Sequence, residues 1–273
     1  MSKENFNRDN IKASSLKRII ISLDFKGLTN IDGWIEKLKT GICRGLFKFY
    51  SRIPFDGMKS TSSQADILYY RLKIPLHELN RLVLHSFSSA NEDHGGEIRL
   101  EITRYTLALV ISTNQDYKRI DPYVKIVNQL VADLCSYDTY VEFSRISIEK
   151  FDVFNFCSSN ELRQYLEETV VFSEKVQDRM WNLQRQYEDR FFDSDISSLV
   201  NYRRDLRVVT DTKGRDVFQV IISFDIYKDE DLIKDDNVSF PDNIEEILNC
   251  LNGKSFELFK RSVTVKYLEE NVR

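Results

Sequence analysis

Glycine and proline are scarce in this chain of 273 residues, which contains 9 Gly and 4 Pro. Because phosphate-binding loops need closely spaced glycines, this scarcity argues against nucleotide-binding loops and favours long regular elements. The sequence contains none of the motifs GxSxG, GxxxxGKS/T, HExxH or GxGxxG. Gly41 and Gly45 lie on a helical pattern, where close packing is the favoured explanation. The signatures of the common hydrolases, P-loop enzymes, zinc proteases and dinucleotide-binding enzymes are therefore missing.

Cysteine is sparse as well, and no CxxC pair exists among Cys43, Cys135, Cys157 and Cys250. Most of them fall on apolar patterns, where a thiol packs as a small hydrophobic group. Residues 1–15 lack the apolar segment of a signal peptide, and apolar runs such as 107–111 are far shorter than the roughly 20 residues that span a bilayer. We therefore expect a cytoplasmic protein with reduced thiols and no membrane association.

An excess of charge of one sign is absent too, because 39 Lys and Arg stand against 43 Asp and Glu. The net charge of −4 gives no chain-wide attraction to nucleic acid. What the sequence does contain is 42% hydrophobic and 12% aromatic residues, enough for a substantial core.

Apolar alternation and helical periodicity occur together and predict an α+β fold, in two layered halves of mainly antiparallel sheet covered by helices. Residues 1–15 are polar and expected to be frayed. The half at 16–157 reads β-α-β-β-β-α-β, with residues 51–65 as a loop and a change of apolar parity near Ser144 that predicts a bulge. Its expected elements are strands at 18–25, 82–88, 97–104, 105–112 and 141–156, a helix capped by Thr29 or Asn30, and a helix that is capped by Asp121 and has Pro122 at its first position.

The second half, residues 158–273, is expected to pack on the first in one body. Ser158 and Glu161 form a capping box that predicts a helix to about residue 170. Residues 172–192 are rich in charge with spaced apolar positions, and we favour one amphipathic helix over a pair of strands. A hairpin at 205–210 and 216–227 follows, and then helices to the end of the chain.

Arg145 is the first candidate binding residue, because it stands in a strand that looks buried. A buried guanidinium is costly unless it meets a carboxylate. Asp24 or Asp225, each at a strand end, is the expected partner. We favour a structural ion pair over an anion-binding role.

A basic cluster supplies the other candidates, namely Tyr202, Arg203, Arg204 and Arg207. If these side chains converge on one groove, Tyr202 stacks on a base while the arginines neutralise phosphates. The favoured alternative is a solvated segment whose arginines pair with the acidic residues upstream, which are Glu188, Asp189 and Asp193.

Histidine offers only a weak catalytic or metal-binding set. His85 and His94, with Asp93 or Glu92, form an acid–base or metal cluster only if the fold brings them together. We favour ordinary structural histidines, and expect no catalytic residue, metal or cofactor.

Several segments together resemble a known family. They are residues 114–123 with Tyr117, the strand Ser144-Arg145-Ile146-Ser147-Ile148, the strand ISFDIY and the ending LFKRSVTVKYLEE. The order of these segments resembles an uncharacterised, sporadically distributed bacterial family of similar length, with an Arg-Ile-Gly-x-Arg type strand in mid-chain. Here Ser147 replaces the glycine and Glu149 replaces the second arginine. The resemblance implies a cytoplasmic bacterial α+β protein.

The functional expectation follows from missing catalytic motifs and from 13 Tyr and 18 Phe, which are residue types that anchor interfaces. We expect a non-enzymatic protein that binds another protein as an accessory, immunity or regulatory subunit, in a bacterial mobile-element or defence locus. Two alternatives stay open. One is nucleotide or nucleic-acid binding through the basic cluster, and the other is an enzyme whose site the sequence does not reveal.

Overall fold

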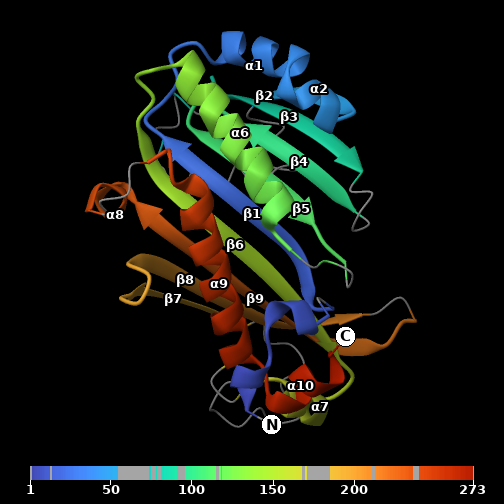
Figure 1. Cartoon of the computed structure of the whole chain (residues 1–273). Coiled ribbons are helices and arrows are strands. Elements are labelled where there is room, and N and C mark those ends of the chain that lie inside the picture. The colour runs from blue at the N-terminus through green and yellow to red at the C-terminus, as the bar shows by residue number, and fades with distance from the viewer. Residues whose placement is uncertain are drawn as a thin grey trace.

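Nine strands form one antiparallel sheet in the order β2-β3-β4-β5-β1-β6-β9-β8-β7 (Figure 1). The strands are β1 (Leu16–Phe25), β2 (Phe49–Pro54), β3 (Val83–Ala90), β4 (Glu97–Ile102), β5 (Thr106–Ser112), β6 (Phe143–Phe156), β7 (Arg185–Asp193), β8 (Ser198–Thr210) and β9 (Asp216–Asp229). With the helices described below, the fold is α+β, as predicted. The structure is a computed structural model that describes the chain except residues 1, 13, 55–73, 75–77, 79–80, 91–95, 115–116, 118, 168–169, 171–184, 211–212, 236–239 and 273.

Helices cover one face of this sheet (Figure 1). The two long helices, α6 and α9, cross that face and contact each other, and α9 also contacts β6 and β9. Helices α1 and α2 lie at the end of the sheet that contains β2, and α7 and α10 pack together near the chain termini. The helices are α1 (Ile31–Thr40), α2 (Ile42–Leu46), α6 (Asp121–Tyr137), α7 (Ser159–Tyr165), α8 (Glu230–Asp235), α9 (Ile244–Ser262) and α10 (Val265–Glu270).

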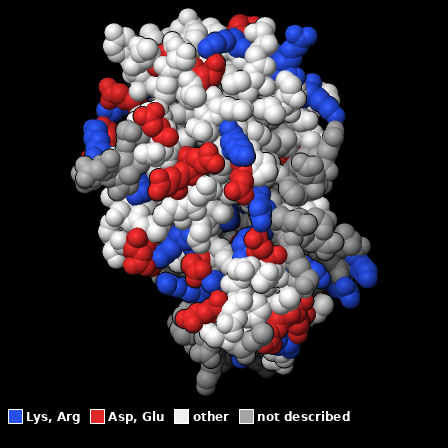
Figure 2. All heavy atoms as spheres, in the orientation of Figure 1, with Lys and Arg blue, Asp and Glu red and all other residues white. Residues whose placement is uncertain are grey.

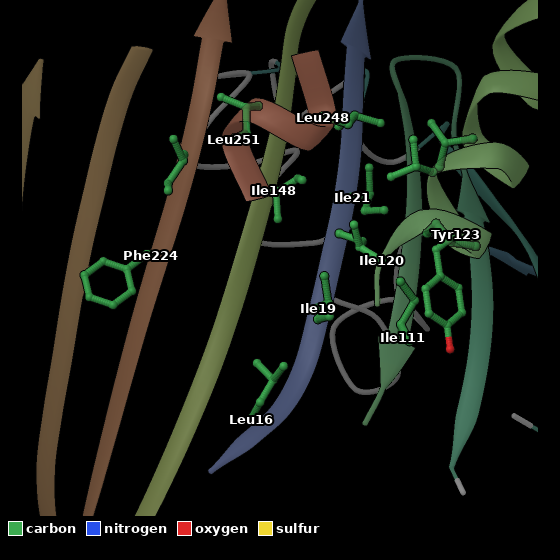
Figure 3. Close-up of a cluster of buried hydrophobic side chains, with 14 of the residues drawn as sticks. Leu16, Ile19, Ile21, Ile111, Ile120, Tyr123, Ile148, Phe224, Leu248 and Leu251 are labelled. Atoms are coloured by element: carbon green, nitrogen blue, oxygen red, sulfur yellow. The ribbon is translucent and has the colours of Figure 1, made fainter. Parts of the chain in front are cut away.

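The main core lies between the helices and the sheet, because alternate residues of each strand point to opposite faces. Ile19 and Ile21 of β1 and Ile148 of β6 point towards Leu248 and Leu251 of α9, as Figure 3 shows. All five side chains are fully buried. Strand β1 pairs with β5 on one side and β6 on the other, so the buried run predicted at 18–25 is an interior strand of the sheet.

The strand pattern confirms several details that the sequence predicts. The pairing of β1 with β6 shifts between Asp24↔Arg145 and Phe25↔Phe143, which leaves Ser144 as the extra residue of the predicted bulge. Asn30 caps α1 by accepting a hydrogen bond from the Gly33 amide. Strands β8 and β9 form the predicted hairpin, although β8 begins at Ser198 and is longer than expected.

Other predictions were wrong in particular places. Residues 51–54 belong to β2 rather than to a loop, because β3 pairs with them at the edge of the sheet. Residues 185–192 form β7 rather than a helix, since β8 supplies a pairing partner that helical periodicity does not reveal. The helix opened by Ser158 ends at Tyr165, earlier than about residue 170, and α6 has Ile120, not Asp121, at its N-cap.

The chain termini are packed rather than frayed. Phe6 and Ile11 are 4% and 0% exposed, and Ile11 forms a bridge with Val272 near the other end of the chain. Residues 16–157 and 158–273 share the one sheet, because β6 of the first pairs with β9 of the second along twelve residues, from Arg145↔Asp229 to Phe156↔Phe218. The boundary between the predicted halves therefore passes through a continuous sheet.

Candidate functional site

A cavity of about 430 Å³ lies beside the β2 end of the sheet, and we call it the arginine pocket after Arg52, Arg81 and Arg104. Arg52 lies on β2, Arg81 precedes β3, and Arg104 lies in the turn between β4 and β5. The other lining residues are Ile31, Asp32, Glu78, Leu82, Val83, His85 and Tyr105. Four separate stretches of the chain thus contribute to one cavity.

Local hydrogen bonds fix two walls of the arginine pocket. The Thr103 hydroxyl accepts hydrogen bonds from the amides of Tyr105 and Thr106, which tightens the turn between β4 and β5 and places Arg104 and Tyr105 at its tip. The Asn30 cap starts α1 directly before Ile31 and Asp32, which also line the pocket. The wall residues therefore sit on short, well-anchored segments.

His85 is the buried titratable group of the pocket, and it is only 2% exposed. Its Nδ1 shares a hydrogen bond of 2.9 Å with the Tyr50 hydroxyl, and its Nε2 lies 3.8 Å from Asp32 Oδ1. Burial lowers the pKa of His85, and Arg52 and Lys39 add to that shift, while Asp32 opposes it. His85 is therefore a neutral, fixed imidazole at neutral pH.

The pocket's charges are mixed, with the cations in excess. Within the part of the chain that the structure describes, Arg52 and Arg81 form no ion pair. Arg104 donates from Nε to the Leu28 carbonyl, 3.1 Å away, which uses one of its five N–H groups. Glu78 accepts a hydrogen bond of 2.8 Å from the Tyr105 hydroxyl, and this contact, together with burial, raises the pKa of Tyr105.

Next to the pocket lies the outer border of β2, which we call the β2 edge (Phe49–Pro54). Strand β2 ends the nine-stranded sheet on this side, and five of its six residues are exposed. Phe49 is 69% exposed and Tyr50 37%, which is unusual for large aromatic side chains on a strand. Arg52 belongs to both the β2 edge and the pocket, so the two features are continuous.

Arg145 forms an ion pair with Asp225, one of the two carboxylates that the sequence proposes for it. Its Nη2 lies 2.7 Å from Asp225 Oδ2, and it stands opposite Asp24 in the pairing of β1 with β6. Its guanidinium also lies over the Tyr227 ring, 3.8 Å from the centroid. Burial by itself lowers the pKa of Arg145, but Asp225 and Asp24 outweigh burial and raise it. The contacts are those of the structural ion pair favoured by the sequence.

The basic cluster does not converge on one groove. Strand β8 is extended, so Tyr202 and Arg204 point to the helix-covered face of the sheet while Arg203 and Arg207 point to the other. The Tyr202 ring stacks on Phe224 at 5.2 Å, and Arg204 donates to the Val170 carbonyl. Arg207 donates two hydrogen bonds to Gln219 Oε1. The interpretation of a base-stacking site with four cooperating side chains is therefore wrong.

Arg203 lines a second hollow, of about 490 Å³, on the face away from α6 and α9. In that hollow, Asp225 forms an ion pair with Arg145. It also accepts a hydrogen bond of 3.1 Å from the side-chain amide of Asn201. Arg203 stands opposite Glu188 in the backbone pairing of β7 with β8, and the expected pairing of the arginines with acidic residues upstream stays a prediction. Acids and bases are thus close to balance in this hollow, which further includes Glu149, Asp189 and Arg190.

Of the histidine set, only His85 is within the described residues, since His94, Asp93 and Glu92 lie outside them. No group of three described His, Cys, Asp and Glu residues is arranged to hold a metal ion. None of the described helices is both long and apolar enough to cross a membrane. Over the face drawn in Figure 2, Lys and Arg are interspersed with Asp and Glu, with no broad basic surface.

Sequence reasoning missed the arginine pocket. Arg52, Arg81 and Arg104 are separated by more than twenty residues each, and no motif links them. The sequence showed only one isolated arginine in a short strand and another at a turn. Exposed arginines of this kind are common on protein surfaces. Comparison with protein-family models, with curated proteins and with solved structures found no match to this chain.

Proposed function

We propose that this chain is a non-enzymatic binding protein whose β2 edge receives an extended segment of another protein. The observation that supports this most directly is the exposure of Phe49 at 69% on a strand that, among the residues the structure describes, lies at the end of the sheet. An edge strand offers unpaired N–H and C=O groups to an incoming strand, and exposed side chains beside it provide anchors. Leu46, 37% exposed at the end of α2, extends the apolar surface.

The composition of the two sheet edges favours β2 over β7 as the docking strand. Proteins protect edge strands from unwanted pairing with charged side chains. Strand β7, sequence RQYEDRFFD, contains five charged residues in nine, whereas β2, sequence FYSRIP, contains one in six. The β2 edge therefore has the weaker protection against pairing, which is expected of a strand that receives a partner.

The accessory, immunity or regulatory role in a bacterial mobile-element or defence locus remains part of this proposal, as does a cytoplasmic location. All four cysteines are free thiols, which supports a reducing compartment. Asp225 of the second hollow pairs with Arg145 and accepts a hydrogen bond from Asn201, and this supports a structural role for that carboxylate rather than acid–base catalysis. The genes that neighbour this one provide an inexpensive first check on the role.

The decisive experiment is affinity capture from cells that carry the gene, with Phe49→Ser and Phe192→Ser as a matched pair. Phe192 lies on β7 and is 53% exposed, so the control removes a similar side chain from the other edge. We expect a stoichiometric partner whose affinity falls at least about 30-fold with Phe49→Ser, as for a hot-spot aromatic, and is unchanged with Phe192→Ser. Absence of a partner, or equal loss with both variants, contradicts the proposal.

A further inference from the structure

We propose that the arginine pocket binds a small-molecule oxyanion, a phosphate or carboxylate group, through Arg52 and Arg81. This inference does not rest on the proposed function, because the pocket is a cavity of about 430 Å³ that needs no partner protein to form. Its volume lies in the range of small-ligand sites, about 300 to 1,000 Å³.

The two guanidinium groups of Arg52 and Arg81 are the first feature that favours an oxyanion. Among the residues that the structure describes, no carboxylate pairs with Arg52 or Arg81, although both line the same cavity. By contrast, the buried Arg145 is held 2.7 Å from Asp225. A guanidinium presents a planar fork of N–H donors that matches the two oxygens of a carboxylate or phosphate. Two unpaired forks at one cavity are a suitable arrangement for an oxyanion.

The groups around the two arginines limit where an anion can sit. Arg104 is anchored by its bond to the Leu28 carbonyl, so its remaining donors stay at the pocket wall without a large loss of side-chain entropy on binding. The start of α1, at Ile31 and Asp32, presents the positive end of a ten-residue helix to the same cavity. These groups add to the attraction of Arg52 and Arg81.

The acidic residues of the pocket further define the ligand. Glu78 accepts a hydrogen bond of 2.8 Å from the Tyr105 hydroxyl. Asp32 is largely exposed, and its Oδ1 lies 3.8 Å from Nε2 of His85. The accessible Asp32 carboxylate, which lines the same cavity as the arginines, accepts hydrogen bonds from hydroxyl or amino groups. The ligand class that fits is therefore a small oxyanion with a hydroxyl or amino group beside it, such as a hydroxy acid or a sugar phosphate.

The test is calorimetric titration of the full chain at low salt with inorganic phosphate, with glycerol phosphate, with malate and with an acidic peptide. Arg52→Gln and Arg81→Gln are the test variants, and Arg44→Gln on α2 is the control, since Arg44 is exposed and outside the pocket. We expect saturable binding that weakens at least tenfold in each test variant and stays unchanged in the control. Thermal unfolding of every variant verifies the fold.

Three outcomes overturn this inference. One is the absence of binding by all probes up to about 10 mM, which corresponds to less than about 3 kcal/mol of affinity. Another is an equal loss with Arg44→Gln, which indicates unspecific charge attraction. The third is binding of an acidic peptide alone, which assigns the arginines to a partner protein. Loss of partner capture with Phe49→Ser leaves the oxyanion result unaffected, so failures of the two proposals are distinguishable.

Discussion

Lys150 is a buried lysine of β6, and burying its charged form costs free energy. It is 6% exposed on the helix-covered side of β6, and its Nζ donates to Asn252 Oδ1 of α9 over 2.6 Å. Burial lowers its pKa to about 7, and the nearby Arg8 adds to the shift. Asp152, two residues along the strand, has its pKa raised by burial. The two groups occupy positions where apolar side chains pack elsewhere in the sheet.

The sign of the pH effect at Lys150 follows from these values. The unfolded chain keeps the ordinary lysine pKa of 10.5, whereas the folded pKa is about 7. Between these pH values the unfolded state binds the extra proton, so the free energy of unfolding rises with pH through this window. Below about pH 7 the destabilisation is present in full.

We therefore expect Lys150→Met to increase the free energy of unfolding by about 2 kcal/mol at pH 7, with a smaller increase at pH 9.5, because the apolar side chain removes the cost of burying a charge. Urea unfolding at both pH values measures the difference. Lys125→Met, at an exposed position of α6, is the control and should show no such pH dependence. A loss of stability that is equal at both pH values would contradict the assignment.

At the scale of the element, α1 shows how one cap positions a functional wall. The Asn30 side chain accepts from the Gly33 amide at 3.1 Å and starts the helix where Asp32 enters the arginine pocket. The helix then buries Trp34, Ile35 and Leu38 and ends at Thr40, before Gly41. The cap therefore contributes to both the stability of α1 and the geometry of the pocket.

We expect Asn30→Ala to reduce the free energy of unfolding by about 1 kcal/mol, because one helix N–H loses its acceptor. Asn30→Ser, which keeps a side-chain oxygen at the cap, should recover most of that loss. Chemical denaturation of the three proteins measures both changes. An Asn30→Ser variant as unstable as Asn30→Ala would show that the cap hydrogen bond is not the cause.

At the scale of the molecule, the continuous sheet decides how the protein unfolds. The long pairing of β6 with β9 joins residues 16–157 to 158–273, and α9 of the second part covers α6 and β6 of the first. Removing either part exposes a sheet edge and an apolar face to water. The main core is one cluster with residues from both parts, such as Ile21 and Leu251.

One cooperative unfolding transition is therefore expected for the whole chain. Trp34 lies in α1, fully buried, and its indole donates to Asp133 of α6, so its fluorescence reports on the first part of the chain. In a Trp181→Phe background, the Trp34 fluorescence transition and the far-UV circular dichroism transition in urea should coincide. Two separated midpoints, or a well-folded fragment 1–157, would show that the parts unfold independently.

The sequence by itself determined those elements whose signal is local. The buried strand at 18–25, the bulge at Ser144 and the Asn30 cap depend on apolar parity and on side chains within a few residues. The partners of Arg145 were also predictable, because a buried guanidinium needs a carboxylate and few stood near strand ends. Strand β7 was missed because it is an edge strand whose charged side chains disturb the alternation of apolar residues.

Only the tertiary structure determined which residues come together in the candidate site. Whether Tyr202 and Arg203 cooperate depends on the extended conformation of β8, which sends neighbouring side chains to opposite faces, and the sequence left that segment open to other interpretations. The arginine pocket has three arginines, Arg52, Arg81 and Arg104, only because neighbouring strands bring together the residues of β2, the start of β3 and the turn after β4. Such convergence depends on strand order, and strand order is set by packing between residues far apart in sequence.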